Sequence, residues 1–166
     1  MEPLRVYLTG ADRDAQAEVA DWLRRRHGFV RVTLPGGRTD AAPVGGGDPA
    51  RPAAMALEHG GRRADLVIDG VRTPVEAEHL RARGVLGVRV AVPVPGGGEP
   101  PDGLATVPVD LVLPLADQSL ACDRDMRLLV ARLAVLHATR ATASRVLPAR
   151  GVWQGGRGRC GTTRTP

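Results

Sequence analysis

Length, composition and charge limit what this chain can be. Its 166 residues, 43% of them hydrophobic, suffice for one α/β domain with a buried core and a tail. No apolar run approaches about 20 residues and there is no basic, apolar leader, so we expect no membrane span, no secretory signal and a cytoplasmic location. Cys122 and Cys160 are too few and too far apart for a disulfide framework, which fits a reducing compartment.

The charge is unevenly distributed along the chain. Residues 1–125 contain 15 arginines and all 18 acidic residues, whereas residues 126–166 contain 8 arginines and no acidic residue. All 23 basic side chains are arginine, and coding bias in a GC-rich genome and selection for phosphate binding are the alternative explanations. Because the chain has no lysine, no chemical step can use one.

The N-terminal segment has the layout of a phosphate-binding unit. The predicted order is a strand at 4–8, a turn at Gly10, a helix capped by Asp12 or Asp14 that runs to about His27, and a strand at 29–34. In such a unit the backbone N–H groups of the turn and of the helix N-terminus hold an anion.

The turn lacks most of the residues of a phosphate loop. Compared with G-x-x-x-x-G-K-[ST], residues 10–17 read GADRDAQA and keep only the first glycine, Gly10. Ala15 replaces the second glycine, Gln16 the lysine that reaches the β- and γ-phosphates, and Ala17 the hydroxyl that would bind Mg²⁺. We therefore expect ATP binding to be weak or absent.

Charge at the same turn also disfavours a polyphosphate. Asp12 and Asp14 bring two carboxylates to this place, and Arg13 offsets only one of them. Two interpretations stay open. The turn is either a capped helix start without a ligand, or an atypical nucleotide site in which Gly10, Arg13 and Gln16 contact the phosphates.

The segment after the second strand is rich in Gly, Pro and Ala. Residues 35–63 predict a mobile loop with a short helix around Ala53–Glu58. Its arginines, among them Arg38 and Arg51, could contact an anionic acceptor, although solvated loop arginines are the commoner case.

Residues 64–92 predict a βαβ unit. The apolar run 66–68 is a buried strand that stops at Asp69-Gly70. Thr73, Pro74 and Glu76 then form a capping-box helix start, and Gly84 ends the helix before a strand at 85–94. Asp69 therefore lies at the carboxyl end of an inner strand, where open α/β sheets bind ligands.

The last predicted elements are a strand at 107–115 and a long helix. A second Gly/Pro-rich loop, 93–102, precedes that strand, and the polar turn 117–119 follows it. The helix starts near Cys122 or Asp123 and extends as far as Val146 before Pro148. Its apolar residues recur at helical spacing and are expected in the core: Met126, Leu129, Val130, Leu133 and Leu136.

The C-terminal segment predicts a disordered basic tail. We expect a domain at 1–147 and a tail at 148–166. Trp153 among arginines is the composition of an RGG-like nucleic-acid contact, but a merely solvated tail is the commoner outcome. His27, His59, His79 and His137 are scattered without a metal-ligand spacing, so no metal site is expected.

Residues 66–84, LVIDGVRTPVEAEHLRARG, resemble a segment of the small P-loop nucleotide kinases, of the deoxynucleoside monophosphate kinase and dephospho-CoA kinase type. The resemblance implies that Asp69 lies beside the phosphate site and that Arg72 touches phosphate or acceptor, which makes these two the catalytic candidates. It also implies ATP and Mg²⁺ as cofactors if kinase activity is retained. The structural alternative is that Asp69 caps a turn and Arg72 pairs with Glu76.

These observations predict a three-layer α/β sandwich with a mainly parallel sheet of about five strands, similar to P-loop kinases. The leading function is a nucleotide kinase-like domain with lost or weakened phosphoryl transfer that binds a nucleotide or a protein. One alternative is an active nucleoside or nucleotide kinase that uses Arg13 in place of the lysine. The other is a nucleic-acid-associated accessory protein that works through its tail.

Overall fold

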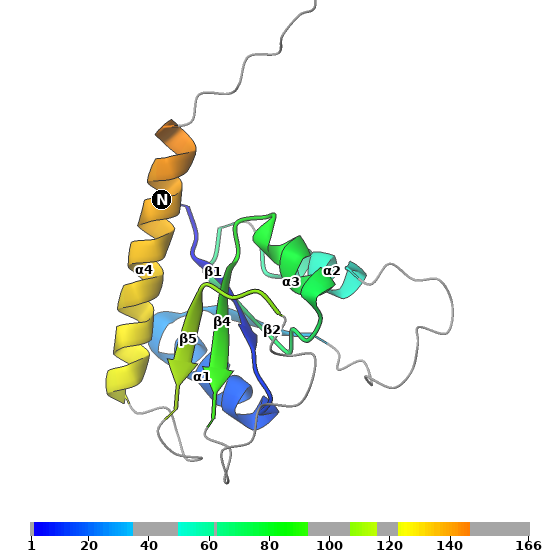
Figure 1. The fold of residues 1–166 in the computed structure, drawn as a ribbon, viewed down its shortest axis with the longest axis vertical. Helices are drawn as coiled ribbons and strands as arrows, with labels where there is room; N and C mark the ends of the chain where they lie inside the picture. Colours follow the sequence, from blue (N-terminus) through cyan, green and yellow to red (C-terminus); the bar gives the residue numbers. More distant parts are fainter. Residues whose placement is uncertain (1, 35–49, 62, 93–106, 116–122, 147–166) are drawn as a thin grey trace, which may run out of the picture.

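The chain folds into one parallel sheet with helices on both of its faces (Figure 1). The computed structural model describes residues 2–34, 50–61, 63–92, 107–115 and 123–146. The elements in chain order are β1 (Arg5–Thr9), α1 (Arg13–His27), β2 (Val30–Thr33), α2 (Arg51–His59), β3 (Leu66–Asp69), α3 (Pro74–Arg81), β4 (Leu86–Ala91), β5 (Leu111–Pro114) and α4 (Asp123–Val146). None of the helices in these ranges is long and apolar enough to span a membrane.

The five strands lie in the order β2-β3-β1-β4-β5, and every neighbouring pair is parallel. In the register, Tyr7 of β1 lies opposite Ile68 of β3 on one side and Gly87 of β4 on the other. The predicted three-layer α/β sandwich with a parallel sheet is therefore confirmed. Asp69 lies at the carboxyl end of an inner strand, as expected.

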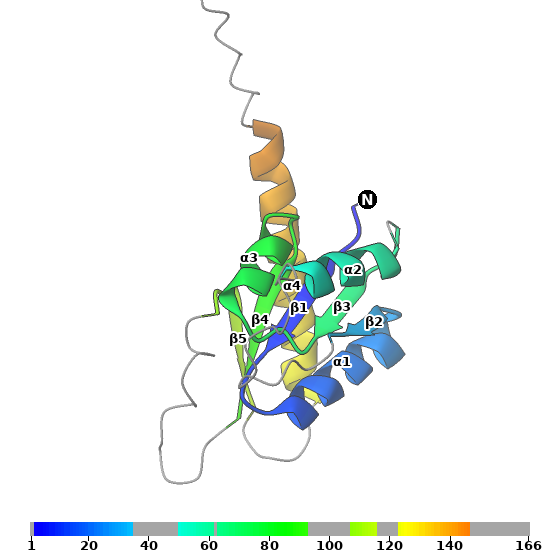
Figure 2. The ribbon, with the colours of Figure 1, turned by 90° about the vertical axis from the view of Figure 1, so that its right-hand side faces the viewer.

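Alternating side chains of the sheet form two apolar layers. Figure 2 shows helices that cover them, with α2 and α3 on one side of the sheet and α1 on the other. Val6 and Leu8 of β1 face α1 and α4, where they pack with residues such as Leu23 and Leu133. Tyr7 points to the opposite face and packs among α2 and α3 with residues such as Leu80. The α4 residues predicted for the core do face the sheet, because Met126, Leu129 and Leu133 are at most 3% exposed.

Local sequence signals define the helix starts. Asp12 is the N-cap of α1, and Gly28 ends this helix in the left-handed conformation, with φ of 72°. Thr73 and Glu76 form the predicted capping box of α3. Gly84 terminates α3 as predicted: it takes the left-handed conformation with φ of 79°, its N–H donates to the carbonyl of Arg81 at 2.9 Å, and the N–H of Val85 donates to the carbonyl of Leu80 at 3.2 Å.

The last strand is shorter than predicted. It begins at Leu111, and residues 107–110 are not part of it. Pro108 has no N–H to donate, and the Oδ2 atom of Asp110 accepts the N–H of Gly87 at 2.7 Å, which a backbone carbonyl of a longer strand would otherwise accept.

Asp110 connects three elements at the amino-terminal edge of the sheet. Its Oδ1 atom lies 3.3 Å from Nη2 of Arg81 in α3 and 2.5 Å from Nη2 of Arg140 in α4. The Asp110 side chain is only 12% exposed, so these contacts are screened less than surface ion pairs. One carboxylate thus joins helices that lie on opposite faces of the sheet.

Several predictions concern residues outside the described ranges. They are the loop at 35–49 with Arg38, the loop at 93–102, the polar turn at 117–119, and the basic tail with the domain boundary at 147–148. The short helix expected at Ala53–Glu58 is present as α2 and is longer, covering Arg51–His59.

Candidate functional site

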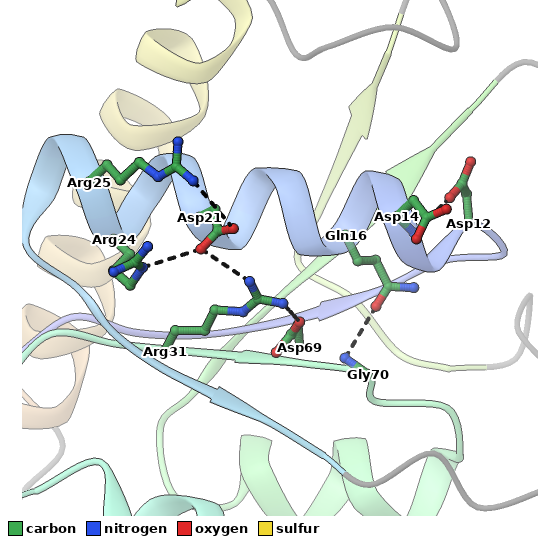
Figure 3. A network of polar contacts seen from close by, with 9 residues as sticks. All are labelled: Asp12, Asp14, Gln16, Asp21, Arg24, Arg25, Arg31, Asp69 and Gly70. Atoms are coloured by element: carbon green, nitrogen blue, oxygen red, sulfur yellow. Dashed lines mark hydrogen bonds and ion pairs between the residues drawn. The ribbon is translucent and has the colours of Figure 1, made fainter.

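The candidate site lies at the carboxyl edge of the sheet, where the turn after β1 meets the turn after β3 (Figure 3). The first turn contains Gly10, at which an added Cβ would lie 2.3 Å from the carbonyl oxygen of Val90 in β4. Only glycine allows this close approach of the two backbones. Gly10 therefore brings the turn against β4, whatever it does toward a ligand.

Asp12 occupies the N-terminus of α1. Its Oδ1 atom accepts hydrogen bonds from the backbone N–H groups of Asp14 at 2.9 Å and of Ala15 at 3.0 Å. The helix begins at Arg13, so only residues 10–12 separate it from β1. In a phosphate loop a longer turn leaves such N–H groups free for a phosphate. Here the chain's own carboxylate satisfies them.

Gln16 connects the two turns. Its side chain is 3% exposed, and its Nε2 atom donates to the carbonyl oxygen of Gly10 at 2.8 Å. Its Oε1 atom accepts the N–H of Gly70 at 3.3 Å (Figure 3). A lysine at this position could replace the first hydrogen bond but not the second, because an ammonium group has no acceptor. Glutamine is thus suited to hold the turns together.

Asp69 is paired with an arginine that sequence analysis did not single out. The Oδ2 atom of Asp69 lies 2.6 Å from Nη2 of Arg31 on β2, and Asp69 is 4% exposed. Arg31 also lies 3.1 Å from Oδ1 of Asp21 in α1, and the hydrogen bond with Asp69 is the main cause that raises the Arg31 pKa. The only sequence signal for this pair is a charged residue within the predicted strand 29–34, and it does not identify the partner.

Two buried oxygens at this edge have no hydrogen-bond partner within the described ranges. They are Oδ1 of Asp69 and Oγ1 of Thr9, at the ends of the neighbouring strands β3 and β1. Within the same ranges, His, Cys, Asp and Glu side chains form no group of three that could hold a metal ion. Asp69 is therefore the one carboxylate at the end of β3, and its other oxygen is already engaged by Arg31.

Arg13 and Arg72 bring two positive charges to the site. Arg13 is the first residue of α1 and is exposed, whereas Arg72 follows β3 and is half-buried. Burial lowers the Arg72 pKa, the nearby charge of Arg13 lowers it further, and Glu76 opposes both effects. Oε2 of Glu76 accepts the backbone N–H groups of Arg72 and Thr73, each at 3.1 Å, and neither guanidinium makes an ion pair in the described structure. The expected Arg72–Glu76 contact thus involves the Arg72 backbone.

The site residues predicted from the sequence therefore lie close together, and they differ in the contacts that their side chains make. Gly10, Gln16 and the turn after Asp69 are connected by hydrogen bonds, Asp69 is bound to Arg31, and Arg13 approaches Arg72. The roles assigned to Asp69 and Arg72 in catalysis and to Gly10, Arg13 and Gln16 in cofactor binding stay predictions.

Comparison with known proteins identifies the fold. No protein-family model matches the chain, and no curated protein matches it. Among solved structures, a gluconokinase from Sinorhizobium meliloti 1021 superposes with a TM-score of 0.56 at 13% identity, over 86% of this chain and 98% of that one. The chain has a P-loop kinase-like fold. The SH3-kinase fragment of tight junction protein 3 also matches, with a TM-score of 0.46 at 12% identity, over 82% of this chain and 58% of that one.

Proposed function

We propose that this chain is a nucleotide kinase-like domain, of the deoxynucleoside monophosphate kinase and dephospho-CoA kinase type, that has lost ATP-dependent phosphoryl transfer and acts as a binding module. The observation that carries the proposal is the Asp12 carboxylate, which accepts the α1 N–H groups that a phosphate would need. The expected cytoplasmic location belongs to the same proposal.

An ATP phosphate chain would have to displace Asp12 from the helix N-terminus. A carboxylate there contributes about 0.5–2 kcal/mol through capping, and it repels a polyphosphate if it stays nearby. Mg²⁺ would find no hydroxyl at Ala17, and the Oδ2 atom of Asp69 is bound to Arg31. The residues present therefore do not fit an Mg-ATP complex, and we assign no step to one.

Isothermal calorimetry with Mg-ATP tests this proposal directly. We expect no binding in the micromolar range and no phosphorylated product when nucleosides and nucleoside monophosphates are offered as acceptors. A matched variant combines Asp12→Gly, Ala15→Gly, Gln16→Lys and Ala17→Ser, and should gain measurable Mg-ATP binding if these positions alone disable the site. Tight binding or phosphoryl transfer by the unaltered chain would overturn the proposal.

One observation favours a second candidate, an active or nucleotide-binding kinase that uses Arg13. The charge of Arg13 adds to burial in lowering the Arg72 pKa and outweighs the opposing charge of Glu76, neither arginine makes an ion pair within the described ranges, and a bound anion would relieve the repulsion between them. Under this candidate, nucleotides bind and Arg13→Gln weakens that binding at least tenfold. Under the first proposal, Arg13→Gln changes nothing measurable in the same titration.

A further inference from the structure

The outward face of α4 carries an apolar stripe that nothing in the described structure covers. Leu128, Ala131, Val135 and Ala138 follow one another at spacings of three, four and three residues, and all four are exposed. Leu128 is 50% exposed and Val135 is 65% exposed. This spacing is that of a helix-pairing seam, whereas the buried stripe of the same helix lies on its opposite side. We call these four residues the α4 stripe.

A groove begins beside this stripe. It has a volume of about 140 Å³ and lies between the edge strand β5 and the first turns of α4. Val112 of β5, which is 49% exposed, lines it together with Leu128 and Leu129. A cavity of about 150 Å³ holds a benzene ring, so this groove can accept one large apolar side chain.

The charges around the stripe are positive and unpaired. Arg124, Arg127 and Arg132 are exposed on α4, and none of them makes an ion pair or side-chain hydrogen bond within the described ranges. Arg140, on the buried side, is by contrast bound to Asp110. Asp125 is the one acidic side chain at the groove, and residues 126–146 contain no other.

We propose that the α4 stripe and its groove bind an amphipathic helix of another protein, whose apolar residues pack on the stripe and whose flanking acidic residues pair with Arg124, Arg127 and Arg132. Small residues alternate with larger ones along the stripe, so a second helix can approach closely with its own large side chains over Ala131 and Ala138. This inference rests on the proposed function and deepens it, since it names the kind of partner that the binding module binds.

The charges argue against a second copy of the chain as the occupant. Pairing two α4 helices would bring arginine-flanked stripes together with only Asp123 and Asp125 of each helix to compensate. The stripe has two side chains larger than alanine and no aromatic residue, which disfavours membrane insertion, for which large apolar and aromatic residues are typical. An apolar seam also does not suit a nucleic acid, whose contacts are mainly with phosphates.

The test uses the full chain and two designed helical peptides. Both carry leucine at the a and d positions of each heptad, and the e and g positions are glutamate in one peptide and lysine in the other. Fluorescence anisotropy should show that the glutamate peptide binds at least tenfold more tightly than the lysine peptide, and that its affinity falls as salt is raised. Val135→Glu should reduce its affinity at least tenfold.

A matched control separates this surface from a general effect of added charge. Val75→Glu places the same substitution at a 46% exposed position on α3 and should leave peptide binding unchanged. Both variants should keep the melting temperature of the unaltered chain, because both side chains are exposed. Equal binding of the two peptides, or binding that Val135→Glu does not weaken, would overturn the inference.

Other occupants would also be detected. A dimer in light scattering, or binding to anionic vesicles or to RNA, that Val135→Glu abolishes would replace the inference with that occupant. Mg-ATP calorimetry on the Val135→Glu variant keeps the two proposals apart. If the chain binds Mg-ATP while the peptide still requires Val135, the proposed loss of activity fails and the docking surface stands.

Discussion

Arg31 holds Asp69 from the neighbouring strand, with 2.6 Å between Nη2 of Arg31 and Oδ2 of Asp69. The two residues are 38 positions apart in the sequence and meet because β2 and β3 are parallel neighbours, in a register that places Arg31 opposite Val67. The Asp69 side chain is 5% exposed and that of Arg31 is 22% exposed. The carboxylate predicted to serve a magnesium nucleotide is thus already neutralised by the chain itself.

The pair predicts an asymmetric response to substitution. Arg31→Met leaves a buried carboxylate without its counter-ion and should lower the free energy of unfolding by about 3 kcal/mol. Asp69→Asn should cost less, about 1–2 kcal/mol, because Arg31 keeps its contact with Asp21. Urea unfolding measures both. The control is Arg24→Met, which removes an exposed partner of Asp21 and should cost less than about 0.5 kcal/mol. If all three variants lowered the free energy of unfolding equally, the buried Arg31–Asp69 contact would contribute no more to stability than an exposed ion pair.

Replacing Asp12 should lower the stability of the chain and raise its affinity for anions. Asp12→Ala removes the acceptor of two N–H groups and should destabilise the chain by about 1 kcal/mol. The freed helix N-terminus should then bind inorganic phosphate, so phosphate should raise the melting temperature of Asp12→Ala more than that of the unaltered chain. Asp14→Ala is the control, because the Asp14 carboxylate accepts neither of these N–H groups. If phosphate affects both variants alike, the cap does not block an anion.

Gln16 predicts a pair of complementary variants. Gln16→Glu keeps an acceptor for the N–H of Gly70 but loses the donor to the carbonyl of Gly10, and Gln16→Lys does the reverse. Each should cost about 1–3 kcal/mol in thermal or urea unfolding, because each leaves one buried polar group unsatisfied. Gln16→Lys on its own should not create Mg-ATP binding. A stable, ATP-binding Gln16→Lys protein would show that the missing lysine is the whole defect.

The capping box of α3 allows a comparison of one substitution at two positions. Thr73→Ala removes the hydroxyl that accepts the N–H of Glu76 and should cost about 1 kcal/mol. Thr139→Ala removes a hydroxyl inside α4 that only bonds the carbonyl of Val135, and it should be neutral or slightly stabilising because alanine favours helix. Circular dichroism melting of the two variants measures both changes in stability. A loss of stability in Thr139→Ala equal to that in Thr73→Ala would contradict the capping role.

Tyr7 predicts how stability changes in alkali. Burial raises the Tyr7 pKa from 10.0 to about 12, and its hydroxyl donates to the carbonyl of Pro108. Because the folded state holds the proton more tightly than the unfolded state, this contribution is fully present below pH 10 and is lost as the pH rises toward 12. The chain has one tyrosine, so ultraviolet titration reports this group alone. Ionisation near pH 10 in the folded protein would show that Tyr7 is not protected.

Several features of this protein follow from neighbouring residues in the sequence. The α3 start is encoded by Thr73, Pro74 and Glu76, which lie within four residues of one another, and the cap and end of α1 are encoded by Asp12 and Gly28. The buried strand before Asp69 and the apolar repeat from Met126 were likewise sufficient to predict a parallel sheet covered by helices. Such elements are predictable because capping and hydrophobic periodicity act over a few residues.

The state of the candidate site was decided by the tertiary structure. The sequence shows that Gln16 stands where a phosphate loop has a lysine. It does not show that the Gln16 amide joins Gly10 to Gly70, which lies 54 positions after Gln16. It placed Asp69 at a strand end, but it gave no reason to choose Arg31 among 23 arginines as the partner. Asp110 likewise meets Arg81 and Arg140 only when α3 and α4 are packed on opposite faces of the sheet. Side-chain pairing across distant elements depends on strand order and register, which are set by the packing of the whole sheet and not by any local pattern.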